Sequence, residues 1–153
     1  MKSSKLLLLL TAFVFLFTGV QQAGAKDRIA AGIILGEPSG ISLKFGKFPV
    51  LAFGFSGVYG HLHVNLDYWI INKPIEAPFF WYLGVGAKLW LGSYNIHKAA
   101  DNFALGARVP IGLQWFITNE WELFLEAAPG VMIFSYSGAG FWWDAGIGIR
   151  YHF

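Results

Sequence analysis

Two histidines separated by one residue, His61 and His63, have a spacing that metal sites use. In a β-strand, residues i and i+2 point to the same face, so the two imidazoles would lie side by side. A third ligand would have to come from Asp67 or His152 on the same face. The sequence does not identify that partner. It therefore favours buried, hydrogen-bonded histidines, and we predict no metal site and no cofactor.

Groups that could form a catalytic triad also lie close together in the sequence. They are Ser56, His61, His63 and Asp67 around one predicted strand connection, and His97 with Asp101 in the longest predicted loop. A triad requires a nucleophile, a base and an acid aligned on one surface, but the strand alternation points Ser56 inward with the histidines. The chain also has no Gly-x-Ser-x-Gly element. We therefore predict no catalytic residues and no enzyme activity.

Eight charged residues inside the predicted strands share one parity, opposite to that of the apolar residues. Four are positive and four are negative: Lys44, Lys88, Arg108 and Arg150, with Asp67, Glu122, Glu126 and Asp144. Such groups persist in a low-dielectric interior only when they are paired or hydrated. A selective pore would need a charged constriction, whereas a balanced set favours an interlocked plug of ion pairs. We predict the plug, formed by this lumenal charge network.

The elements that must position these residues are β-strands, because apolar residues alternate with small and polar ones. In the last segment one parity carries Phe141, Trp143, Ala145, Ile147, Ile149, Tyr151 and Phe153. The same alternation predicts eight strands, at 28–36, 40–48, 50–59, 61–70, 79–91, 103–117, 121–133 and 141–153. The breaks between them are rich in Gly, Pro, Asn and Ser, as strand connections are. The chain is therefore predicted to be all-β with short loops.

The small residues indicate which face of these strands is the interior. Many of the 19 glycines share the charged parity, and the lumen of a small eight-stranded barrel only just holds its side chains. Outward aromatic residues gather at the predicted strand ends: Tyr68, Trp81, Trp115, Trp121, Tyr151 and Phe153 at one rim, and Tyr59, Phe103 and Trp143 at the other. Such girdles are typical of membrane barrels. We predict an eight-stranded antiparallel up-and-down transmembrane β-barrel over residues 26–153, with a soluble lipocalin-like barrel or sandwich as the alternative.

The first 25 residues have the three-part layout of a secretory signal peptide. Lys2 and Lys5 precede an apolar run at 6–17, and Ala23-Gly24-Ala25 provides the small residues of a cleavage site. The apolar run is too short for a membrane-spanning helix, which needs about 20 residues. We predict a signal peptide at 1–25 that is cleaved after Ala25.

The composition excludes several classes of protein. The chain is 56% hydrophobic and only 13% charged, against about a quarter charged in ordinary soluble domains, so it is not disordered. The absence of cysteine excludes a disulfide framework, a thiolate metal site and a cysteine nucleophile. Without Lys2 and Lys5, the eleven lysines and arginines fall to nine and balance nine acidic residues, so no nucleic-acid partner is predicted.

Two features resemble known proteins. The pattern Ala145-x-Ile147-x-Ile149-x-Tyr151-x-Phe153 resembles the C-terminal signal by which Gram-negative bacteria recognise barrels for outer-membrane insertion. The segments 36–44, 108–113, 123–129 and 146–153 are similar, in that order, to a family of short bacterial outer-membrane barrels of mostly unknown function, related in shape to outer-membrane protein A. The resemblance implies the fold and the compartment. It implies no catalytic residues.

Together these observations predict a non-catalytic protein of the bacterial outer membrane with a membrane-structural or surface-interaction role. Its expected partners are outer-membrane lipids and, through the strand that ends at Phe153, the barrel-assembly machinery. The alternatives are a surface protein that binds a host protein or ligand through its short outward loops, a lipid-modifying enzyme and a narrow small-solute channel. Residues for an extracellular protein contact are Tyr94, Ile96, His97, Tyr136 and Phe141.

Overall fold

The computed structural model describes residues 28–46, 49–58, 60–92, 103–134 and 140–153, and these residues form an all-β fold. The strands are β1 (Ile29–Glu37), β2 (Ser39–Phe45), β3 (Val50–Phe55), β4 (Leu62–Glu76), β5 (Phe79–Leu91), β6 (Phe103–Arg108), β7 (Ile111–Phe116), β8 (Trp121–Phe134) and β9 (Gly140–His152). No helix among the described residues is long and apolar enough to cross a membrane.

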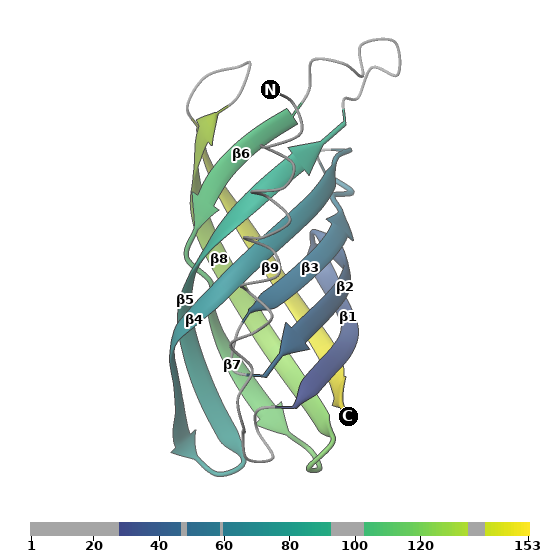
Figure 1. Cartoon of the computed structure of the whole chain (residues 1–153), viewed down its shortest axis with the longest axis vertical. Coiled ribbons are helices and arrows are strands. Elements are labelled where there is room, and N and C mark those ends of the chain that lie inside the picture. The colour runs from purple at the N-terminus through teal and green to yellow at the C-terminus, as the bar shows by residue number, and fades with distance from the viewer. Residues whose placement is uncertain (1–27, 47–48, 59, 93–102, 135–139) are drawn as a thin grey trace, which may run out of the picture.

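The described strands pair in a closed ring of eight positions, and every pairing is antiparallel. Apart from β6 and β7, each strand pairs with its neighbour in the chain, and β1 also pairs with β9, which closes the ring. β6 and β7 follow one another in a single position between β5 and β8. Figure 1 shows the tilted strands arranged around a common axis, with the C terminus at the same end as the β7–β8 turn.

A proline interrupts the strand that the sequence predicted at 103–117. Proline has no backbone N–H to donate to a ladder, so pairing stops between Arg108 and Ile111. The neighbouring strands bridge this gap. The backbone N–H of Val109 donates to the carbonyl of Pro129 (2.9 Å), and that of Gly84 donates to the carbonyl of Pro110 (2.8 Å). The predicted single strand is therefore two segments that share one place in the ring.

The β4–β5 hairpin is longer than the sequence predicted. The polar stretch after Ile71 was expected to be a loop, but β4 continues to Glu76 and turns at Ala77–Pro78. Pairing with β5 extends to Pro74↔Phe80 and Glu76↔Phe79 and contains two register shifts. One shift lies between Trp69 and Ile71, and the other adjoins Pro74, which has no backbone N–H to donate to the ladder. The prediction of a loop at 72–76 was wrong. Asn72 and Pro74 are residues typical of turns, but pairing with β5 holds this segment in an extended conformation.

The ring has a polar interior and an apolar exterior. Along β9 every even-numbered residue from Trp142 to His152 is buried, whereas the odd-numbered residues are exposed or half-buried. Buried polar and charged residues come from all strands except β1 and β3. The exposed large side chains are mostly aliphatic and aromatic. The alternation in the sequence therefore identified both faces of the sheet correctly.

Aromatic rings fit over glycines on adjacent strands inside the ring. A Cβ atom at Gly112 would overlap the ring of Tyr82, and one at Gly148 would overlap the ring of Phe124. Each glycine is the direct cross-strand partner of the aromatic residue that covers it. Trp142 covers Gly130 and Gly106 in the same way. The interior is narrow, and several of its large side chains lie where the neighbouring strand has no side chain.

This packing predicts different outcomes for two identical substitutions in β9. Gly148→Ala places a methyl group inside the ring of Phe124 and should lower the free energy of unfolding by about 1–3 kcal/mol, the usual cost of overpacking. Gly140→Ala meets nothing within 4 Å and should change it little. Denaturant unfolding of the refolded protein in detergent measures both. Equal effects of the two substitutions would contradict the packing.

Candidate functional site

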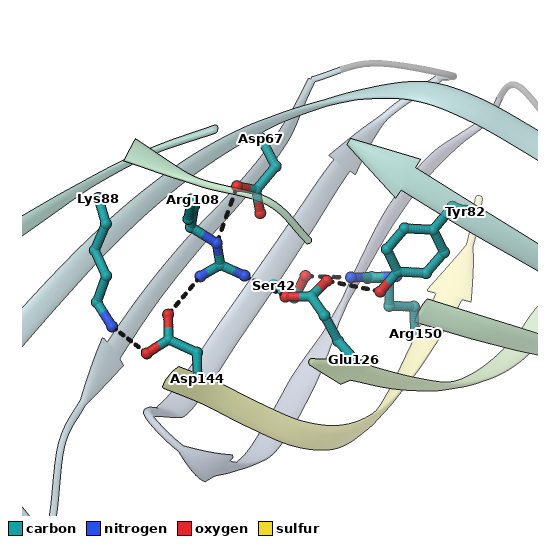
Figure 2. A network of polar contacts seen from close by, with 8 residues as sticks. All are labelled: Ser42, Asp67, Tyr82, Lys88, Arg108, Glu126, Asp144 and Arg150. Atoms are coloured by element: carbon teal, nitrogen blue, oxygen red, sulfur yellow. Dashed lines mark hydrogen bonds and ion pairs between the residues drawn. The ribbon is translucent and has the colours of Figure 1, made fainter. Parts of the chain in front are cut away.

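Arg108 is the centre of a cluster of acidic residues in one half of the interior. Its guanidinium Nη1 donates to Asp144 Oδ2 (2.9 Å), Nη2 donates to Glu126 Oε1, and Nε lies 3.2 Å from Asp67 Oδ1. The three acids come from β9, β8 and β4, as Figure 2 shows. Lys88 of β5 donates to the other oxygen of Asp144. One cation therefore ties together strands on opposite sides of the ring.

Tyr82 extends this cluster toward the middle of the ring. Its hydroxyl donates to Glu126 Oε2 at 2.6 Å, so both oxygens of that carboxylate have a donor. The ring of Tyr82 stacks on Trp69 with 3.9 Å between centroids. Both side chains are fully buried. The tyrosine thus joins the ionic network to the aromatic packing around it.

Glu122 is the centre of a second cluster with the opposite arrangement of charge. Arg150 Nη1 donates to its Oε1 (2.8 Å), Lys44 Nζ lies 3.6 Å from its Oε2, and His152 Nε2 lies 2.6 Å from the same oxygen. Gln114 also donates to Oε1, at 2.8 Å. Glu122 has no exposed surface. A fully buried carboxylate requires several donors of this kind, because each unmet bond would carry a desolvation cost.

The cations of both clusters also contact aromatic faces. Arg150 lies 3.6 Å from the centroid of Phe124, and its Nε donates to Ser42 Oγ at 3.0 Å. Lys88 lies 5.1 Å from the ring of Trp90, which packs edge-on against Trp142. Cation–π contacts of this kind become stronger where water is excluded. In addition to these aromatic contacts, every one of the eight predicted network residues has an oppositely charged partner in the interior.

The residues considered for metal binding or catalysis do not assemble. Asp67 is paired with Arg108, and neither ring nitrogen of His63 has a hydrogen-bond partner among the described residues. Ser56 and His61 are joined by a backbone bond across their turn, from the N–H of Ser56 to the carbonyl of His61. Within the described part of the chain, no group of three or more His, Cys, Asp or Glu side chains could hold a metal ion. His97 and Asp101 lie outside the described residues.

The surface-contact residues are mostly beyond what the structure describes. Tyr94, Ile96, His97 and Tyr136 fall within 93–102 and 135–139, outside the described residues. Phe141 is described, and it is 63% exposed near the end of β9, with its ring against that of Trp143. Phe141 and Trp143 therefore form an exposed aromatic pair on the outer face.

Four polar members of the interior network were not predicted as such from the sequence. They are Ser42, Tyr82, Gln114 and His152, each a partner of a charged residue. His152 was considered only as a possible metal ligand. All four share the parity of the charged residues, and that parity was the available signal.

An all-β antiparallel ring with an ion-paired interior is the class that this fold and site define. Within that class, the chain belongs to the family described as "Protein of unknown function (DUF3996)", whose match covers residues 20–152. Comparison with curated proteins and comparison with solved structures each found no match. The family has no assigned activity, so the functional conclusion depends on the geometry of the ring.

Because Arg108 is the common partner of three acids, its replacement should strongly lower the free energy of unfolding. Arg108→Met leaves three carboxylates facing one another without their common partner, and breaking a buried pair costs about 3–5 kcal/mol. Arg28→Met, at an exposed position before β1, should have little effect. The free energy of unfolding of the two variants decides between a structural network and an incidental one. Comparable stabilities would argue against the network.

Proposed function

We propose that this chain is an eight-stranded transmembrane β-barrel of the bacterial outer membrane, exported with a signal peptide cleaved after Ala25. The observation that carries the proposal is the inverted distribution of side chains, with charges inside the ring and large apolar residues outside. In a water-soluble protein, charged residues are seldom buried and apolar residues form the core. An apolar outer band around a polar interior is the arrangement of outer-membrane barrels.

The exposed apolar surface supports a lipid environment. It continues around the ring on neighbouring strands, for example Ile33, Ile41, Phe53, Leu66, Val85, Leu113, Leu125 and Ile147. Contiguous apolar surface on this scale is unusual for a monomeric soluble protein. Closure of the ring supports the same conclusion, because backbone groups in lipid must be paired between strands.

The aromatic residues at the C-terminal end of the ring support the depth and orientation that we propose for the barrel in the membrane. Trp121, Tyr151 and Phe153 form a chain of edge-on ring contacts near the C terminus, with centroids 5.0 and 5.2 Å apart. Phe79 and Trp115 form a further pair on the outer face. Amphipathic rings are most stable at the interface between lipid and water. We place this end at the periplasmic side, together with the terminal Phe153 that the assembly machinery would bind.

The role that fits this barrel best is non-catalytic. The interior is occupied by paired charges and stacked rings, and among the residues considered for chemistry Asp67 is paired with Arg108 and His152 with Glu122. We therefore infer a membrane-structural or surface-interaction role in a barrel shaped like outer-membrane protein A. The proposed partners are outer-membrane lipids, the assembly machinery and an extracellular protein ligand.

A pair of lysine substitutions tests the lipid environment. Ile147 and Ile75 are 55% and 62% exposed, the first in the middle of β9 and the second next to the β4–β5 turn. In phospholipid vesicles, Ile147→Lys should lower the free energy of unfolding by about 2–4 kcal/mol, whereas Ile75→Lys should cost much less near the interface. Folding is followed by gel migration in SDS, because a closed barrel migrates differently before and after boiling.

Ile75→Lys is the matched control, since the two residues have the same side chain and similar exposure. Two equal and small effects, with no difference between boiled and unboiled samples, would mean that the apolar face lies in water. The outer-membrane proposal would then be wrong.

A further inference from the structure

A small cavity lies between the Arg108 cluster and the wall formed by β1 to β4. Its polar lining consists of Glu37, Ser42, Asn65, Asp67, Arg108, Glu126, Asp144 and Arg150, and the rest of the lining is apolar. The cavity volume is about 20 Å³, which is sufficient for one water molecule or a particle of similar size. Most of the polar side chains in the lining are hydrogen-bond acceptors. The ligand that fits these polar groups is a small donor.

Two oxygen atoms at this cavity have no donor among the described residues. Asn65 is 4% exposed, and its Oδ1 is buried without a hydrogen-bond partner. Glu37 accepts a bond from the N–H of Val58 through Oε2, but its Oε1 is buried and unpartnered. Buried acceptors are normally satisfied in folded proteins. Both residues line the cavity, so a group inside it that donates in more than one direction would supply the missing donors.

The charges around the cavity do not balance. Among the described residues, its lining and the adjoining Lys88 comprise four carboxylates (Glu37, Asp67, Glu126 and Asp144) against Lys88, Arg108 and Arg150. Arg150 also pairs with Glu122 in the other cluster, but Glu122 has Lys44 as a second cation, so the charge of Arg150 still counts here. One negative charge is thus left in excess. In an interior of low dielectric constant, such an excess requires a proton or a bound cation.

We propose that this cavity binds a small monovalent cation of the ammonium class, which donates hydrogen bonds to Asn65 Oδ1 and Glu37 Oε1. A metal ion fits less well, because the described residues contain no group of three or more ligating side chains. An ammonium ion has the size of a water molecule, carries one positive charge and has four donors. The one carboxylate in excess balances its charge, and the two unpartnered oxygens accept its hydrogen bonds.

The test is the thermal unfolding of the refolded mature protein in detergent at constant pH and ionic strength. Ammonium chloride replaces tetramethylammonium chloride in steps, since tetramethylammonium has the same charge but no donors and is too large for the cavity. We expect a saturable rise in the unfolding midpoint with ammonium only. Methylammonium should give a smaller rise, because the cavity has little room for the methyl group.

Two variants locate the effect. Asn65→Leu removes the buried acceptor and should weaken the apparent affinity for ammonium about tenfold or more, the usual effect of losing a hydrogen bond to a charged group. Glu37→Gln keeps an acceptor at the rim but removes a charge, and it should also weaken the binding of ammonium. This variant tests the proposal even if Asn65→Leu does not fold. Glu76→Gln, at an exposed position on β4, is the control and should leave the affinity unchanged.

Three results would overturn the proposal. One is equal stabilisation by ammonium and tetramethylammonium. Another is an ammonium effect that Glu37→Gln and Glu76→Gln change equally. The third is a rise in stability on acidification with no dependence on ammonium, because a proton would then neutralise the excess carboxylate.

Discussion

The width of the ring is the constraint on which the rest of the structure depends. The ring encloses an interior that side chains just fill, so several of the large rings inside lie opposite a glycine. Tyr82 over Gly112 and Phe124 over Gly148 are examples. The same narrowness brings charges from distant strands within reach of one another. Arg108 can therefore contact acids from three strands, and Glu122 has four partners from three strands.

The two centres have consequences for how the strands are held together. Pairing between neighbours fixes the ring only locally, whereas Arg108 joins β4, β6, β8 and β9 across the interior. Removing one member of such a buried group is costly, although replacing the entire group by apolar residues need not be. In the proposed lipid environment, outward residues would gain little from contact with one another, so the interior network would supply much of the specificity that a soluble protein obtains from its apolar core. The proposal of a membrane barrel depends on this contrast between a paired polar interior and an apolar outer face.

Much of this arrangement could be predicted from alternation alone, and the exceptions have specific causes. The parity of β9 identified Asp144 and Arg150 as inward, because a strand has only two faces. Parity does not give depth or position around the ring, so the meeting of three acids at Arg108 required the register of four strands. Pro110 divides the strand predicted at 103–117 because it has no N–H to donate to the neighbouring strand. That neighbouring strand is distant in the sequence, so alternation within 103–117 did not reveal the break. Inward polar residues such as Gln114 were not assigned to the network, which was predicted from formal charges alone.

The most direct test of the central claim is the environment of the outward face of β9. The chain has no cysteine, so single cysteines at Ala145, Ile147 and Ile149 can carry a nitroxide label in protein refolded into phospholipid bilayers, with a label at Ile75 as the aqueous reference. The account predicts that the three β9 labels collide with oxygen, which dissolves in lipid, and that a water-soluble nickel chelate does not reach them. The chelate should reach the label at Ile75. Access of the chelate to all four labels would contradict it.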